Sequence, residues 1–200
     1  NSSGSGGDIT PGLWTASDSE AGYSGDPHSG NYAARINNIG GGYHASKIFQ
    51  TDAISQQDID NGSTLYVHWD AILNNPSGHN GYQPFFGIDV IIGGATAGTF
   101  YADAESRQGG GWDDLGSNNW HKGDTWSYDL SSYALGTAVT VEMYVADCGY
   151  GAHGGFAIID GLGTIDPGTP GTPGVPAPGA LLLGGLGAGL VGMIRRRRLA

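Results

Sequence analysis

Carboxylates are the side chains of this sequence that are best suited to bind a cation. The chain has 19 Asp and Glu residues, and Ca²⁺ takes six to eight oxygen ligands from carboxylates and backbone carbonyls on loops. Asp160 interrupts the apolar run Ala157–Leu162, where a buried carboxylate must be paired or bound to a metal. The alternative is an Asp that caps a turn or faces water. No EF-hand loop is present.

A second group of side chains could recognise a sugar. Aromatic rings stack on the apolar faces of pyranose rings, while amides and carboxylates fix the hydroxyls. A glycine-rich segment between residues 109 and 126 contains Trp112, Asp113, Asp114, Asn118, Asn119, Trp120 and His121. We predict that Trp112, Trp120 and Asp113 contact a glycan, with Tyr82 on another expected loop. The alternative is that the tryptophans belong to the core, as large aromatic side chains in small sandwiches usually do.

Catalytic side chains form no recognisable pattern. A glycosidase needs two carboxyl groups at a defined spacing, and three Glu and sixteen Asp offer many pairs without a motif that selects one. The six histidines are scattered, and neither HExxH nor Gly-x-Ser-x-Gly occurs. Cys148 has no motif around it and is expected to be a small packed side chain. We therefore predict that the protein is not an enzyme.

The charge distribution argues against nucleic acid as a partner. The formal net charge is −11 over 200 residues, but four of the eight basic side chains are Arg195, Arg196, Arg197 and Arg198. Residues 1–167 contain 19 acidic and four basic side chains, hence a net charge of −15. A body this acidic repels phosphate backbones and attracts cations.

The first residues, rather than the cysteine content, indicate the cellular compartment of the protein. Cys148 is the only cysteine, so no internal disulfide can form. The chain opens with Asn1-Ser2-Ser3 rather than with Met, as a protein does after its signal peptide is removed. An arbitrary starting point would look the same. We expect an exported protein.

Period-two alternation of apolar and polar residues predicts that β-strands position the candidate cation-binding and sugar-binding side chains. It is clearest in Thr64–Leu73 and Val139–Val145, where β-branched residues are frequent. In Phe85–Ile92 both alternate sets are apolar, which predicts a strand covered on both faces. Shorter candidates are Asn31–Ile36, Tyr43–Phe49, Thr99–Ala104, Trp126–Leu130 and Gly155–Leu162.

These strands predict an all-β fold. Turn-forming stretches such as Gly93-Gly94 and Gly109–Gly111 separate them, and no helical stripe precedes the C-terminal region. Eight or so strands with irregular connections indicate one antiparallel β-sandwich of the jelly-roll type over residues 8–166. Residues 1–7 are expected to form a disordered N-terminus.

The composition changes abruptly after the expected sandwich. Residues 167–178 are rich in Pro and Gly, which predicts a stiff, extended linker. Residues 179–194 have no polar or charged side chain, and an Arg-rich tail follows at 195–200. As a helix, the apolar segment would span roughly 24 Å, somewhat less than the bilayer core. Arg clusters favour the cytoplasmic side, so we predict a short transmembrane helix with the sandwich outside the cytoplasmic membrane.

The order of this C-terminal region is specific. Val175-Pro176-Ala177-Pro178 precedes the apolar segment, and the arginine cluster 195–198 ends it. This order resembles the PEP-CTERM sorting signal recognised by exosortase-type proteases, although Val-Pro-Ala-Pro stands in place of Pro-Glu-Pro. The resemblance implies an exosortase-type processing protease as partner and transient anchoring in the cytoplasmic membrane. It also implies cleavage near Pro176–Pro178 and delivery to the cell surface or extracellular matrix.

The body carries a second, less specific resemblance. The run from Pro27 to Arg35 and the final Ala157-Ile158-Ile159-Asp160-Gly161-Leu162 are similar to exported bacterial jelly-roll domains of the galactose-binding-like, carbohydrate-binding-module type. Gly161 replaces the usual Asn. Such relatives often tie the N-terminal segment to the last strand with one calcium ion. Asp8 and Asp160 match these two places, so the resemblance implies a structural Ca²⁺.

Two functions from different classes follow from these observations. The first is an exported, exosortase-sorted protein of the bacterial surface or biofilm matrix, with a non-catalytic structural or adhesive role. The alternative is a calcium-dependent carbohydrate-binding module that takes exopolysaccharide. A glycoside hydrolase is the third.

Overall fold

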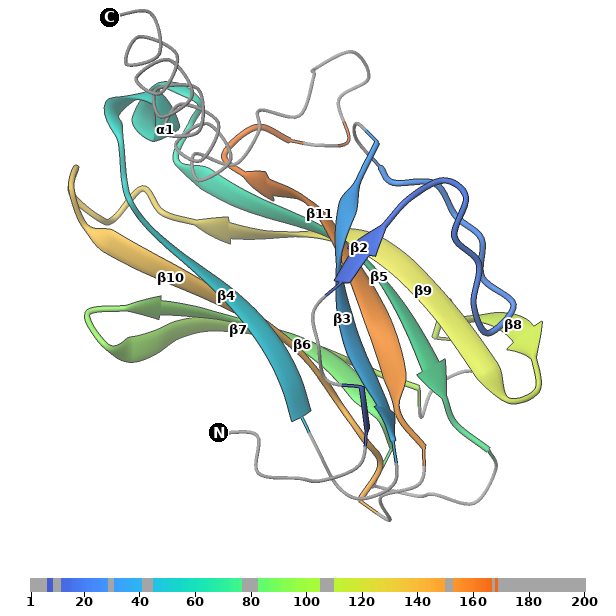
Figure 1. The fold of residues 1–200 in the computed structure, drawn as a ribbon. Helices are drawn as coiled ribbons and strands as arrows, with labels where there is room; N and C mark the ends of the chain where they lie inside the picture. Colours follow the sequence, from blue (N-terminus) through green and yellow to red (C-terminus); the bar gives the residue numbers. More distant parts are fainter. Residues whose placement is uncertain are drawn as a thin grey trace, which may run out of the picture.

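Two antiparallel β-sheets packed face to face make up this protein (Figure 1). The structure is a computed structural model, and it describes residues 7–8, 12–28, 31–40, 45–76, 83–104, 110–149, 153–166 and 168. A single short helix, α1 (Gln56–Asp60), occurs among these residues. The predicted all-β antiparallel sandwich is therefore confirmed.

The larger sheet contains seven strands. They are β1 (Gly7–Asp8), β2 (Gly12–Trp14), β3 (Ala33–Gly40), β5 (Thr64–Asn74), β8 (Asp113–Gly116), β9 (Asn119–Asp129) and β11 (Gly155–Gly163). Their order is β1-β3-β11-β5-β9-β8, and β2 also pairs with β3. The last of the described strands, β11, thus lies in the middle of the sheet, between β3 and β5.

The smaller sheet contains four strands in the order β4-β10-β6-β7. They are β4 (Ala45–Ala53), β6 (Phe85–Ile92), β7 (Ala95–Asp103) and β10 (Ala138–Ala146). Gly93 and Gly94 join β6 to β7, and both have positive φ angles of 62° and 81°. A two-residue hairpin turn needs this backbone conformation, which glycine adopts without strain. The turn predicted at these glycines is confirmed.

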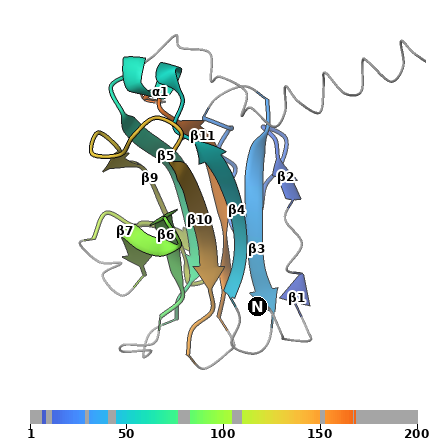
Figure 2. The same cartoon turned by 90° about the vertical axis from the view of Figure 1, so that its left-hand side faces the viewer.

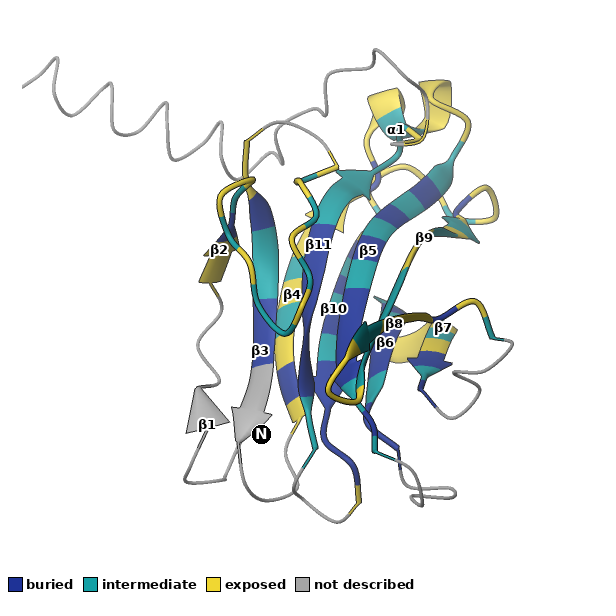
Figure 3. Ribbon diagram, turned by 90° about the vertical axis from the view of Figure 1, so that its right-hand side faces the viewer, coloured by how far each residue is buried: buried dark blue, intermediate teal, exposed yellow. Residues whose placement is uncertain are grey.

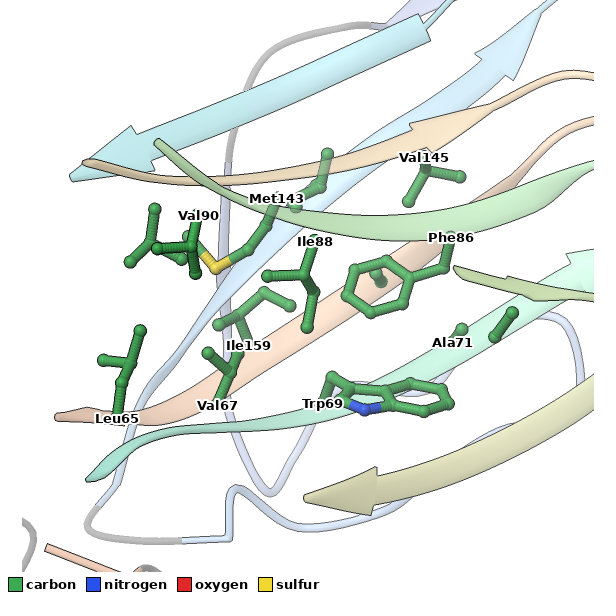
Figure 4. Close-up of a cluster of buried hydrophobic side chains, with 14 of the residues drawn as sticks. Leu65, Val67, Trp69, Ala71, Phe86, Ile88, Val90, Met143, Val145 and Ile159 are labelled. Atoms are coloured by element: carbon green, nitrogen blue, oxygen red, sulfur yellow. The ribbon is translucent and has the colours of Figure 1, made fainter. Parts of the chain in front are cut away.

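The main core fills the space between the two sheets (Figure 4). Because side chains alternate along a strand, Leu65, Val67 and Trp69 of β5 point from one sheet toward β6 and β10 of the other. Trp69 is fully buried and stacks on Phe86 at 5.1 Å between ring centroids. The inward set predicted from Val139–Val145 is also buried in this core.

A second, smaller apolar cluster lies on the outer face of the larger sheet. The N-terminal segment 12–28 runs over this face (Figure 3), and it buries Trp14 against Phe156 and Ile158 of β11. The Trp14 ring stacks on Phe156 at 5.6 Å, and Trp14 Nε1 donates a hydrogen bond to the carbonyl oxygen of Gly25. The larger sheet is therefore covered on both faces.

The C-terminal predictions fall outside the described residues. These are the linker, the transmembrane sorting helix and the Arg-rich tail between residues 167 and 200, of which only Gly168 is described. Within the part of the chain that the structure describes, the helix present is too short to cross a bilayer.

Candidate functional site

Four aromatic side chains gather on the outer face of the smaller sheet. Because the core takes every second residue of each strand, the alternate residues point to solvent. We call Phe49, Phe85, Tyr101 and Tyr144 the aromatic face. One of these residues comes from each of β4, β6, β7 and β10. In Figure 2 these four strands lie toward the viewer, and no other described strand or helix lies in front of them.

Strand register brings three of these rings together. Tyr144 of β10 pairs with Gly87 of β6, and Gly87 pairs in turn with Tyr101 of β7. Phe85 occupies the preceding outward position of β6. Its ring lies 4.8 Å from that of Tyr101 and 6.0 Å from that of Tyr144. The rings thus form a continuous surface that crosses the strands.

Gly87 and Asp89 hold Tyr144 in place. A side chain at Gly87 would overlap the ring of Tyr144, because that ring lies over the glycine. The Tyr144 hydroxyl donates a hydrogen bond to Asp89, which also accepts one from Thr99 Oγ1 at 2.8 Å. Burial raises the pKa of Tyr144, and the charge of Asp89 raises it further. Tyr144 therefore stays a neutral donor, fixed on the sheet.

Polar groups surround the rings. Lys47 lies 3.0 Å from Glu142, and the hydroxyls of Thr51 and Thr140 hydrogen-bond to each other at 2.7 Å. Phe49 is 66% exposed and Tyr101 is 52% exposed. Large rings that stay exposed in a contiguous patch with a polar rim mark an interaction surface. The arrangement can stack apolar ring faces and hydrogen-bond hydroxyls.

Three of the four side chains predicted to contact a glycan lie on or next to the paired strands β8 and β9. Trp112 is 8% exposed and belongs to the main core. Trp120 lies on β9 and packs against the same core. Asp113 is on β8 with a side chain that is 80% exposed, and Tyr82 lies outside the described residues. Their contact with glycan stays a prediction.

The predicted loop around these residues is largely strand. β9 begins at Asn119 and extends seven residues before the predicted Trp126–Leu130 strand. Trp120 and Trp126 point to the core, while His121 and Thr125 point outward. Lys122 and Asp124 stand between Trp120 and Trp126 in the inward set, which hides the alternation in the sequence.

The prediction that β6 is covered on both faces is wrong. Its outward residues Phe85, Asp89 and Ile91 are only partly buried. Side chains of the same sheet contact two of them: the rings of Tyr101 and Tyr144 lie beside Phe85, and Tyr144 and Thr99 hydrogen-bond to Asp89. The apolar pattern of Phe85–Ile92 was nevertheless a sequence signal for the aromatic face, since it places one ring, Phe85, on the outer side of the strand.

A His–Asp cluster lies on the outer face of the larger sheet. His121 Nε2 lies 2.8 Å from Asp70 Oδ1, and His68 Nε2 lies 3.9 Å from Asp70 Oδ2. His68 Nδ1 is 2.9 Å from the hydroxyl of Thr125. A side chain at Gly123 would overlap the Asp70 carboxylate, so glycine makes room for it.

The N-terminal segment covers this cluster with two rings. His28 stacks on His68 at 3.7 Å between centroids, and Tyr23 lies 4.6 Å from His121. Burial raises the pKa of the Tyr23 phenol, and the charge of Asp70 adds to the rise. The cluster therefore contributes to fixing the segment on the sheet.

His68 is expected to make the protein less stable in mild acid. Burial, followed by the charge of His28, lowers the pKa of His68 below its ordinary 6.5, against the opposing charges of Asp70, Asp160 and Asp124. The unfolded chain then takes up the proton first, so unfolding free energy is lost as the pH falls below about 6.5. Urea midpoints measured across this pH range should fall less for His68→Gln than for the wild type. An equal fall in both proteins would contradict the assignment.

The same segment also borders a shallow pocket of about 540 Å³. Its lining includes Asp26, Asn31 and Tyr32, and the Tyr32 ring is 63% exposed. This pocket lies on a different part of the molecule from the aromatic face. It is the rival location for a bound ligand.

The two residues implied in calcium binding lie on different strands of the larger sheet, Asp8 on β1 and Asp160 on β11. Asp8 pairs with Ile39 of β3, whereas Ile159, the neighbour of Asp160, pairs with Ala34. Ile39 and Ala34 are five residues apart along β3, about 17 Å at roughly 3.4 Å per residue. Among the described residues, no group of three His, Cys, Asp or Glu could hold a metal. A structural Ca²⁺ stays a prediction.

Comparisons with known proteins identify no family for this chain. No family model matches the chain, and no curated protein matches it. Among solved structures, it is similar to TmCBM61 in complex with β-1,4-galactotriose, with 11% identity, a TM-score of 0.41, and coverage of 78% of this chain and 81% of that one. It is also similar to CBM28, a carbohydrate-binding module specific for non-crystalline cellulose, with 14% identity, a TM-score of 0.39, and coverage of 76% of this chain and 86% of that one. A cyclase from Fischerella sp. TAU is similar as well, with 15% identity, a TM-score of 0.41, and coverage of 76% of this chain and 73% of that one. Similarities of this size do not assign a function.

Proposed function

We propose that this chain is a non-catalytic polysaccharide-binding protein and that the aromatic face is its binding surface. The observation that carries the proposal is the row of rings formed by Tyr144, Phe85 and Tyr101. A saccharide polymer presents alternating apolar ring faces and hydroxyls. The aromatic face offers rings for the first and Asp89, Glu142 and threonine hydroxyls for the second.

Binding without hydrolysis is favoured by the partners of the two central carboxylates. Glu142 and Asp89 are register partners on β10 and β6. Lys47 contacts both oxygens of Glu142, at 3.0 and 3.1 Å, and Asp89 accepts hydrogen bonds from Thr99 and Tyr144. Both carboxylates thus hold neighbouring side chains, which disfavours a role as catalytic acid or base.

The experiment is retention of the full chain on immobilised β-glucan, galactan and mannan. We expect at least one polymer to retain the protein without releasing shorter sugars. Addition of a chelator tests in the same experiment whether Ca²⁺ contributes. Retention by none of the polymers, or release of oligosaccharides, would contradict the proposal.

We further propose that the C-terminal region delivers this binding module to the cell surface or extracellular matrix, where it has an adhesive role. The proposal rests on the order of Val175–Pro178, the apolar segment and the arginine cluster.

Deletion of Arg195–Arg198 is expected to leave most of the protein unsorted in the membrane fraction, because the cluster sets the orientation of the apolar segment. Cell fractionation with antibody detection measures this. Substitution of all four by Lys is the control, since it keeps the charge. Normal surface delivery of the deletion variant would contradict the sorting proposal.

A further inference from the structure

The aromatic face carries a net negative charge. Asp89, Asp103 and Glu142 occupy outward positions of β6, β7 and β10, in the rows that contain the rings. Lys47 is the one described Lys or Arg on this face, and it contacts both oxygens of Glu142. An incoming anion therefore finds a lysine that already has a partner.

The rest of the described molecule offers no compensating charge near this face. The other described Lys and Arg side chains belong to the larger sheet. Arg35 pairs with Glu20 on the outer face of that sheet, and Lys122 of β9 donates to the carbonyl oxygen of Gly110 at 2.8 Å. Residues 1–167 have a net charge of −15, so the field around the whole sandwich repels anions.

We infer that the polysaccharide bound by the aromatic face is uncharged, and that polymers bearing carboxylates are rejected. This inference rests on the proposed function. Stacking on Phe85, Tyr101 and Tyr144 requires close approach, which places a carboxylate of the polymer near Asp89, Asp103 and Glu142. Like charges brought together in this way disfavour the wrong partner and slow its encounter.

Binding of a polycation would depend differently on salt and on the rings. A cationic polymer binds acidic surface anywhere on the sandwich, and salt screens that attraction. It therefore does not depend on the rings. An uncharged polymer that needs the rings binds almost equally at low and high salt.

The test compares each neutral polymer with its own oxidised form. β-Glucan, galactan and mannan are used as such and after oxidation of their primary hydroxyls to carboxylates, so the backbone stays the same. Affinity of the full chain is measured at low and at high salt. We expect the oxidised form of the retained polymer to bind about tenfold more weakly or worse at low salt, with partial recovery at high salt.

Two charge variants sharpen the test. Asp103→Asn removes one carboxylate beside the rings without touching the hydrogen bonds of Tyr144, so it should bind the oxidised form more tightly than the wild type does. Asp114→Asn on β8 is the matched control and should change nothing. Equal or tighter binding of an oxidised form by the wild type at low salt would overturn the inference alone. Retention of no polymer, neutral or oxidised, would overturn the proposed function and the inference with it.

Discussion

Tyr101→Ala is expected to lower the affinity for the retained polysaccharide by about tenfold or more. Truncation of a central aromatic residue of a binding surface typically costs more than 1 kcal/mol, and about 1.4 kcal/mol corresponds to a tenfold change. Tyr101 is 52% exposed and outside the core but its ring packs on Phe85, so the unfolding free energy should fall by only about 1 kcal/mol. Isothermal titration with soluble polymer measures the affinity, and urea unfolding measures the stability.

The matched control is Tyr32→Ala. Tyr32 is 63% exposed and borders the pocket beside the N-terminal segment, so this substitution removes the same side chain at the rival location. We expect unchanged affinity. The opposite result, with binding lost in Tyr32→Ala and kept in Tyr101→Ala, would move the site to the pocket and contradict the aromatic face.

Phe85→Ala should act together with Tyr101→Ala. The two rings are 4.8 Å apart, and substitutions of residues in contact are generally not additive. The double variant is therefore expected to lose less than the sum of the two single losses. Strict additivity would indicate that the rings contact the polymer independently.

Alternation in the sequence was sufficient to predict which side of many strands faces the core. Val139–Val145 and Thr64–Leu73 show it because one of their faces is apolar and the other is polar. Because every second residue is buried, the apolar set then identifies the core-facing side of the strand without knowledge of the partner strand. The hairpin turn at Gly93-Gly94 was predictable for a similar local reason.

The aromatic face was not predictable in the same way. Tyr144, Gly87 and Tyr101 meet only because β10 pairs with β6 and β6 pairs with β7. The first of these pairings joins strands separated by 45 residues, 93–137, and alternation contains no information on it. The segment around Trp112 and Trp120 was predicted to bind a glycan because aromatic and polar residues are dense there. A strand that alternates aromatic and polar residues produces this density as readily as a binding loop does.

Replacement of Trp112 distinguishes a core residue from a glycan-binding residue. As a core residue, 8% exposed in the main cluster, it should reduce the unfolding free energy by about 3–5 kcal/mol when replaced by Ala. That is a large fraction of the roughly 5–15 kcal/mol that holds a domain together. Urea unfolding measures the loss.

Trp112→Phe keeps the measurement interpretable if the alanine variant does not fold. It retains most of the apolar volume and should cost less than the alanine substitution, because a smaller cavity remains. Its affinity for the retained polysaccharide should equal that of the wild type, since the ring lies in the core between the sheets and the aromatic face lies on the outer side of β4, β6, β7 and β10. Weaker binding by Trp112→Phe at unchanged stability would instead mean that this ring contacts the sugar, as the sequence alone predicts.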